Sequence, residues 1–195
     1  QSAWAYGTSV AWLRELVEYW RSGFDWRTQE AALNAWPQFK VPLGGIDLHF
    51  LHVPGKGPAP LPLLLSHGWP GSVLEFMKLI PMLTDPASHG GDPADAFTVV
   101  APSLPGFGLS FTPGQPRLGC EAIAVVFAQL MTDVLGYRSF VAQGGDWGAF
   151  ITSRLACCYP ERLLGIHLNL LALRRDPAPL PNASPAEQQY LRELA

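Results

Sequence analysis

Short, continuous apolar runs alternate with helix-like segments through most of the chain, and this pattern restricts the fold more than any other feature of the sequence. Apolar runs predict four strands, at Leu61–Ser66, Phe97–Ala101, Ser139–Ala142 and Leu163–Leu170. The periodicity between and after them predicts helices at Ser72–Leu83, Glu121–Leu135 and Phe150–Cys158. Strands that are apolar along their whole length are typical of a parallel sheet covered by helices on both faces. The sequence therefore predicts an α/β protein with a mostly parallel sheet.

The first third of the chain follows a different pattern. Apolar residues at helical spacing predict a helix over Ser9–Trp20, and Asp25 is a plausible N-cap for a second helix that reaches Ala35. Pro37 and Pro42 break this second helix before an expected strand at Ile46–Val53. Near the other end, Ser184 and Pro185 form a typical helix start. Four tryptophans in the helical segments are expected to pack inside the protein: Trp12, Trp20, Trp26 and Trp36.

Composition excludes several classes of protein. The 195 residues carry 13 basic and 16 acidic side chains, a formal net charge of -3, so the chain lacks the basic footprint of a nucleic-acid-binding protein. The apolar stretch Leu163–Leu173 is too short to span a membrane, and no signal peptide is visible, so we expect a cytoplasmic protein unless a membrane anchor preceded Gln1 and was removed. Charged residues make up 15% of the chain, which indicates a surface that further chain or a partner covers.

The strongest local motif is Gly144-Gly145-Asp146-Trp147-Gly148, which lies between a predicted strand and a predicted helix. A nucleophile elbow has small residues on both sides of an exposed nucleophile, because its tight turn leaves no space for larger side chains. Asp146 stands at the nucleophile position, and a carboxylate is already ionised at neutral pH. An isolated Gly-Asp at a helix start is more typical of an N-cap, but the complete motif after a buried strand favours a nucleophile.

A second motif, His67-Gly68-Trp69-Pro70, follows the first predicted core strand. In this architecture one oxyanion donor is the backbone N–H after the nucleophile, and another comes from the loop after this earlier strand. These donors would be the N–H groups of Trp147 and Trp69. We expect His67 to be structural, because the catalytic histidine of this architecture follows the nucleophile and the acid in the sequence.

With these motifs the chain resembles the epoxide hydrolases of the α/β-hydrolase fold, in the branch of the microsomal and juvenile-hormone enzymes. The matching segments include Trp69-Pro70-Gly71-Ser72, Pro105-Gly106-Phe107-Gly108, the elbow, and Gly165-Ile166-His167-Leu168-Asn169. The resemblance extends to Phe24-Asp25-Trp26-Arg27 and to the strand Ile46–Val53 near the start. It implies a lead-in domain at residues 1–58, the first half of the hydrolase core at 59–172, and the start of a lid at 173–195.

The resemblance also implies a two-step reaction that needs no metal or organic cofactor. Asp146 would attack a small apolar epoxide and form an ester, which water would then hydrolyse to a vicinal diol. The Trp69 and Trp147 N–H groups would stabilise the oxyanion, and Trp69, Pro70, Phe107 and Trp147 would line the substrate pocket. The lid tyrosines, the catalytic histidine and its acid would lie in a C-terminal half after Ala195, in the same protein or in a separate chain. A homo-oligomer remains open.

Two alternatives stay open from the sequence. A haloalkane dehalogenase also uses an aspartate nucleophile, often followed by tryptophan. A non-catalytic half-domain that binds apolar ligands or a partner protein would fit the low charge and the lack of a suitable histidine. Neither the five histidines nor the five tyrosines of the chain match the expected catalytic positions.

Overall fold

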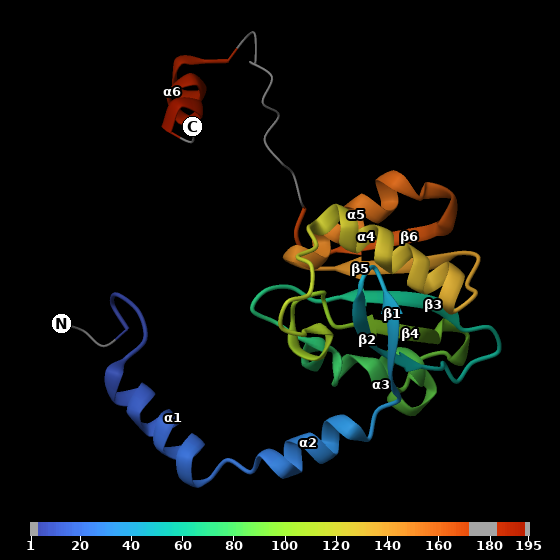
Figure 1. Ribbon diagram of the computed structural model, residues 1–195, viewed down its shortest axis with the longest axis horizontal. Helices are drawn as coiled ribbons and strands as arrows, with labels where there is room; N and C mark the ends of the chain where they lie inside the picture. The colour runs from blue at the N-terminus through green and yellow to red at the C-terminus, as the bar shows by residue number, and fades with distance from the viewer. Residues whose placement is uncertain (1–3, 172–182, 194–195) are drawn as a thin grey trace.

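The computed structural model describes residues 4–171 and 183–193, which contain a six-stranded mixed sheet (Figure 1). The strand order is β1-β2-β4-β3-β5-β6. β2 runs antiparallel to both β1 and β4, and the other three pairs are parallel, so the predicted α/β architecture with a mostly parallel sheet is confirmed. The strands are β1 Gln38–Leu43, β2 Ile46–Val53, β3 Leu61–Ser66, β4 Phe97–Pro102, β5 Phe140–Gly144 and β6 Leu163–Leu168.

Helical segments connect the strands and precede the sheet. The α-helices are α1 Val10–Ser22, α2 Trp26–Asn34, α3 Leu79–Thr84, α4 Cys120–Gln129, α5 Trp147–Cys158 and α6 Pro185–Glu193. The 3-10 turns are η1 Val73–Phe76, η2 Pro86–His89, η3 Pro93–Asp95, η4 Gly108–Ser110 and η6 Pro160–Arg162, and a π-helical turn, η5 Leu130–Val134, continues α4. Asp25 caps α2 as predicted, because its side chain accepts the Arg27 N–H.

Two apolar clusters hold helices against opposite faces of the sheet. Leu64 of β3 and Phe140 of β5 pack with α4 and α5 in one cluster, and Leu63 and Leu65 of β3 pack with η1 and α3 in the other. This division follows from the strand geometry, in which successive side chains point to opposite faces. A fully buried leucine or phenylalanine stabilises a fold by about 1.5–3 kcal/mol, so the clusters fix both layers to the sheet.

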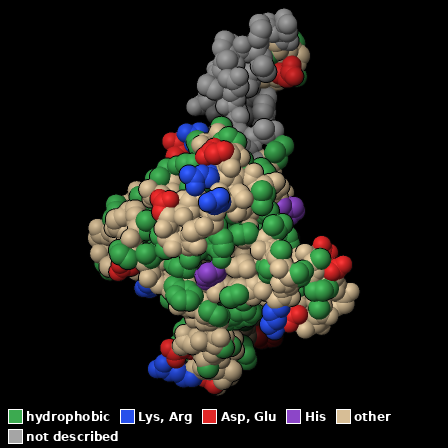
Figure 2. Space-filling model, turned by 90° about the vertical axis from the view of Figure 1, so that its right-hand side faces the viewer, with side chains coloured by type: hydrophobic (Ala, Val, Ile, Leu, Met, Phe, Trp, Pro, Cys, Tyr) green, Lys and Arg blue, Asp and Glu red, His purple; other side chains and the backbone are tan. Residues whose placement is uncertain are grey.

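Coverage of the sheet decreases toward β6. Most residues of β6 are exposed, among them Leu164 and Ile166. Figure 2 shows apolar side chains exposed over the middle of the face that it presents, with charged side chains gathered mainly toward the upper and lower ends. Helices cover both faces of the sheet as predicted, and within the described part of the chain this cover is least complete at β6.

Several elements differ from those predicted. Gln38–Leu43 is a strand that was not predicted, and it tolerates Pro42 because β1 lies at the sheet edge, where a missing N–H costs no ladder bond. The predicted helix over Ser72–Leu83 is divided into η1 and α3, since Pro81 has no N–H to donate to the carbonyl of Met77 and its ring clashes there. The helix after the elbow begins at Trp147 rather than at Phe150.

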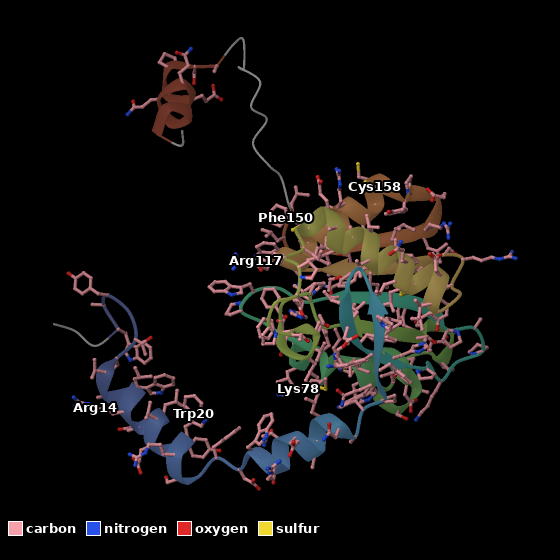
Figure 3. The ribbon with its side chains drawn as sticks, viewed as in Figure 1. Arg14, Trp20, Lys78, Arg117, Phe150 and Cys158 are labelled. Atoms are coloured by element: carbon pink, nitrogen blue, oxygen red, sulfur yellow. The ribbon has the colours of Figure 1, made fainter. Side chains whose placement is uncertain are left out.

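The lead-in helices lie apart from the sheet. Neither α1 nor α2 has a buried residue, and Figure 3 shows Arg14 and Trp20 on opposite sides of α1, with Arg14 on the side away from the strands. The expected packing is wrong for Trp12, Trp20 and Trp26, which are 47%, 68% and 54% exposed, whereas Trp36 packs on the cluster at η1 and α3. None of the helices in the described ranges is long and apolar enough to cross a bilayer.

The carboxyl ends of β3 and β5 form a switch point in the sheet. The two strands are neighbours, but the chain leaves β3 toward α3 on one face and leaves β5 toward α5 on the other. In open α/β sheets the loops diverge at such a point and leave a crevice, which is the usual place for a ligand. The two motifs singled out in the sequence both lie there.

Candidate active site

Asp146 lies in the sharp turn between β5 and α5, in a strained backbone conformation. Its φ of 51° and ψ of -124° are unfavourable for a residue with a side chain. The turn is possible because of its glycines: a Cβ on Gly144 would collide with the carbonyl of Gly148, and one on Gly148 would collide with the carbonyl of Ser66. The geometry is therefore that of a nucleophile elbow, which presents the Asp146 side chain above the sheet.

The carboxylate of Asp146 does not act as a helix cap. No side-chain capping bond links it to α5. Instead, Oδ1 accepts a hydrogen bond of 2.8 Å from the Trp69 N–H, and the carboxylate also interacts with the Trp147 N–H. These two backbone donors, Trp69 foremost, lower the pKa of Asp146 below its usual value and hold the side chain in its charged form.

The turn Gly68–Gly71 carries the Trp69 donor. Its Trp69–Pro70 peptide bond is cis, and the Gly71 N–H donates to the Gly68 carbonyl over 2.9 Å. A Cβ on Gly68 would lie 2.5 Å from Asp146 Cβ and 2.6 Å from its Oδ1. A glycine at this position thus lets the backbone approach the carboxylate closely enough to donate to it.

A cavity of about 480 Å³ opens beside Asp146. It contains two of the predicted pocket residues, Trp69 and Pro70, and four polar residues that sequence reasoning missed: Ser66, Glu75, Gln143 and Asn169. Gln143 Nε2 donates to Asn169 Oδ1 over 2.8 Å, and a Cβ on Gly71 would collide with the Glu75 carboxylate. Their positions at strand ends and in the first turn after the Trp69 loop were the available signals.

The other two predicted pocket residues line a different cavity. Phe107 and Trp147 share a space of about 450 Å³ with the segment Phe111–Leu118, and Asp146 does not line it. The Phe107 ring packs edge-on against His67, with ring centroids 5.9 Å apart. The structure therefore brings Trp69 and Pro70 to the nucleophile but does not gather all four residues in one pocket.

All five histidines lie within the described residues, and three of them have polar partners. His49 lies between Ser103 Oγ at 2.9 Å and Gln38 Oε1 at 3.0 Å, and burial, followed by the charge of Lys40, lowers its pKa to about 4. His52 Nε2 lies 2.8 Å from the Tyr137 hydroxyl. His67 contacts backbone groups of Gly68 and Leu104. These contacts leave the three rings engaged away from the Asp146 carboxylate.

Comparison with known families covers nearly the whole chain. Residues 1–76 match the model described as "Epoxide hydrolase N terminus", and residues 62–191 match the model described as "alpha/beta hydrolase fold".

Individual relatives agree with these two models. The chain is 50% identical over 190 residues to a Stigmatella aurantiaca protein provisionally named an epoxide hydrolase, covering 97% of this chain and 43% of that one. It is 41% identical over 181 residues to epoxide hydrolase 1 of Oryctolagus cuniculus, covering 90% of this chain and 39% of the relative. The crystal structure of juvenile hormone epoxide hydrolase from the silkworm Bombyx mori superposes with a TM-score of 0.76 at 38% identity, covering 86% of this chain and 44% of that one. The chain thus spans about two fifths of the length of the relatives it matches.

Proposed function

The chain belongs to the epoxide hydrolases of the α/β-hydrolase fold, and from this premise we propose that Asp146 is the nucleophile that opens an epoxide. The observation that carries the proposal is the carboxylate at the elbow, held by two backbone N–H groups at the mouth of a cavity. An exposed, ionised carboxylate in this position attacks carbon without prior loss of a proton.

In the first step, the Asp146 oxygen that does not face Trp69 attacks an epoxide carbon. A C–O bond forms between the carboxylate and that carbon, while the bond from the carbon to the epoxide oxygen breaks. The electron pair goes to the epoxide oxygen, which takes a proton and becomes a hydroxyl group. The result is a hydroxyalkyl ester of Asp146. The apolar and aromatic lining near the carboxylate, at Trp69, Pro70 and Phe76, suits a small apolar epoxide.

In the second step, water attacks the carbonyl carbon of the Asp146 ester. The negative charge develops on the carbonyl oxygen, which already lies 2.8 Å from the Trp69 N–H in the free carboxylate. The Trp69 and Trp147 N–H groups stabilise this oxyanion, and the loss of one such donor costs about 3–4 kcal/mol in comparable sites. Collapse of the intermediate breaks the ester bond and releases a vicinal diol.

The proton donor for the first step and the base for the second are not among the residues around Asp146. We place them, as lid tyrosines and a histidine with its acid, on a C-terminal half supplied by the same protein or by a second chain. Without that half, water has to supply the proton of the first step, so the 195-residue chain by itself is expected at best to form the ester slowly and to stop there. The ester is therefore the species to look for.

The test is to incubate the chain with styrene oxide and to measure its denatured intact mass. We expect one addition of the epoxide mass per chain, located at Asp146 by peptide mapping, and no addition to an Asp146→Asn variant. Adducts on other residues, or equal labelling of the variant, would contradict the proposal.

The same assay separates the two alternatives. Halide release from a chloroalkane without reaction with the epoxide would identify a dehalogenase. Binding of apolar ligands without any adduct would instead identify a non-catalytic binding domain.

A further inference from the structure

His67 connects the turn that carries the Trp69 N–H to the loop after β4. The residue is 1% exposed. Nδ1 lies 2.9 Å from the Gly68 carbonyl oxygen, and Nε2 lies 3.0 Å from the Leu104 backbone nitrogen. The Phe107 ring packs edge-on against the imidazole. Both ring nitrogens of His67 therefore have a backbone hydrogen-bond partner.

These partners determine the protonation of the ring. A carbonyl oxygen only accepts, so Nδ1 must carry the proton that it donates to Gly68. The Leu104 N–H only donates, so Nε2 must be unprotonated in order to accept. Burial lowers the pKa of His67, against smaller opposing effects of the Gly68 carbonyl and the nearby Glu75 carboxylate, and this favours the neutral ring.

The bond to Gly68 acts on the nucleophile through one peptide group. The Gly68 carbonyl accepts from His67 Nδ1 and also from the Gly71 N–H, so its direction is fixed by two donors. In a planar trans peptide the C=O and the following N–H point in opposite directions. A fixed Gly68 carbonyl thus aims the Trp69 N–H, which donates to Asp146 Oδ1 over 2.8 Å.

We propose that His67, in its neutral Nδ1–H form, is a positioning residue that orients the Trp69 N–H toward the Asp146 carboxyl group. It touches neither substrate nor the reacting atoms, and it acts through the peptide group between Gly68 and Trp69. This inference rests on the proposed function where oxyanion stabilisation is concerned. The geometry of the hydrogen bond to Asp146 is open to measurement without any epoxide.

Two conservative variants separate the two contacts of the ring. In His67→Asn the side-chain amide replaces Nδ1 and keeps a donor for the Gly68 carbonyl, while the contact with Leu104 is lost. In His67→Gln the side-chain carbonyl replaces Nε2 and keeps an acceptor for the Leu104 N–H, while the donor to Gly68 is lost. His52→Asn and His52→Gln are matched controls, because His52 pairs with Tyr137 instead.

The first measurement follows the backbone amide resonances of Trp69 and Trp147 by NMR as Asp146 is titrated. In the unaltered chain and in His67→Asn, both amides should respond to the protonation of Asp146. In His67→Gln the Trp69 response should be lost, the Trp147 response should remain, and the pKa of Asp146 should rise. An unchanged Trp69 response in His67→Gln, or its equal loss in both variants, would overturn the proposal.

The second measurement uses the styrene oxide ester and hydroxylamine, which replaces the missing base and water. The nitrogen of hydroxylamine attacks the Asp146 carbonyl, the ester bond breaks, and the diol leaves with a proton while Asp146 keeps a hydroxamate. We expect release to slow at least tenfold in His67→Gln and less than threefold in His67→Asn. Equal rates in all variants would contradict the proposal.

The two measurements also distinguish failure of this inference from failure of the proposed function. If no ester forms on the unaltered chain, the proposed function fails, and the amide titration alone decides the role of His67. If His67→Gln does not fold, the ring ¹⁵N shifts of His67 in the unaltered chain decide instead. A protonated Nδ1 with an unprotonated Nε2 supports the proposal, and any other form of the ring overturns it.

Discussion

At the scale of single residues, the site depends on close approaches that leave no space for a side chain. Gly68 is the clearest case, because its Cα faces the carboxylate of Asp146. In Gly68→Ala the new methyl group would lie about 2.5 Å from Asp146 Cβ and force the nucleophile aside. A displacement of about 1 Å can reduce a reaction rate about 100-fold. We expect a loss of this size in the rate of ester formation with styrene oxide, measured by intact mass.

Gly165→Ala is the matched control for this substitution. A Cβ on Gly165 meets no atom within 4 Å, so this variant should form the ester at the wild-type rate. If Gly68→Ala also reacts at the wild-type rate, the description of the turn around Asp146 is wrong.

The buried His49 makes stability dependent on pH. Its pKa is about 4 in the folded chain and about 6.5 when unfolded, so the unfolded state binds more protons between these values. The stabilisation is complete above pH 6.5 and is lost as the pH falls toward 4, by about 3 kcal/mol at most. Urea denaturation at pH 7, 5.5 and 4.5 should show this loss in the wild type and a smaller loss in His49→Gln.

The exposed His89 provides the control for this experiment, because His89→Gln removes an imidazole from the surface. A reduced pH dependence of the unfolding free energy that appears in His49→Gln and not in His89→Gln would assign the effect to the buried site. An identical pH dependence for His49→Gln and the wild type would argue against a buried neutral His49.

The site residues that the sequence predicted are those whose positions are fixed by the backbone geometry of a turn motif. Gly144 and Gly148 indicated a tight turn. The roles of Asp146 as nucleophile and of Trp69 as backbone donor were predicted from their positions in the two motifs. Glu75, Gln143 and Asn169 were missed, because their positions at strand ends and after the Trp69 loop are weak signals, and the packing of η1, β5 and β6 decides which side chains reach the cavity. Phe107 was predicted for the substrate pocket but lies against His67.

At the scale of elements, the turn between β1 and β2 packs on α4. Gly44 and Gly45 both have positive φ, 64° and 77°, but only at Gly44 would a Cβ meet Val126 Cγ2, at 2.5 Å. Gly45→Ala is expected to cost about 1–2 kcal/mol for the backbone conformation alone. Gly44→Ala should lose about 1–3 kcal/mol more because it also overpacks the contact with α4. Chemical denaturation of the two variants measures the difference between their free energies of unfolding. Equal losses would mean that Gly44 is not in close contact with Val126 of α4.

Strands and helices with strong local patterns were predicted within a few residues. The expected strands at β2, β3, β4, β5 and β6 are all present, because their continuous apolar runs leave few other arrangements. β1 was missed because a strand accepts a proline such as Pro42 only at the edge of a sheet, and the order of the strands is set by tertiary structure, which the local sequence does not reveal. The division between η1 and α3 was also missed. A proline can interrupt a helix or lie within the first turn of a new one, and Pro81 lies within the first turn of α3.

At the scale of the whole molecule, β6 forms an outer strand of the described sheet. Leu164 and Ile166 are 57% and 42% exposed on this strand. Exposed apolar edge strands promote association between chains. We expect sedimentation velocity to show concentration-dependent self-association of the chain, and the double variant Leu164→Lys/Ile166→Lys to reduce it.

Met82→Lys on α3 adds a charge to another exposed apolar position and serves as the control. It should associate like the wild type. Association that is unchanged by the β6 variant would place the contact elsewhere, with the exposed aromatic residues of α1 as the next surface to test. Composition indicated this behaviour in outline, since a chain with 15% charged residues has few groups to keep such surfaces apart.

The absence of a capping bond from Asp146 has a consequence for how such a protein changes over evolutionary time. The strained turn is made possible by Gly144 and Gly148, and the Asp146 carboxylate bonds to the Trp69 and Trp147 N–H groups rather than capping the first turn of α5. The fold therefore does not depend on which side chain occupies the tip of the elbow. A lineage can exchange the attacking atom, from oxygen of a carboxylate to that of a hydroxyl or to sulfur, while the scaffold beneath it is inherited unchanged.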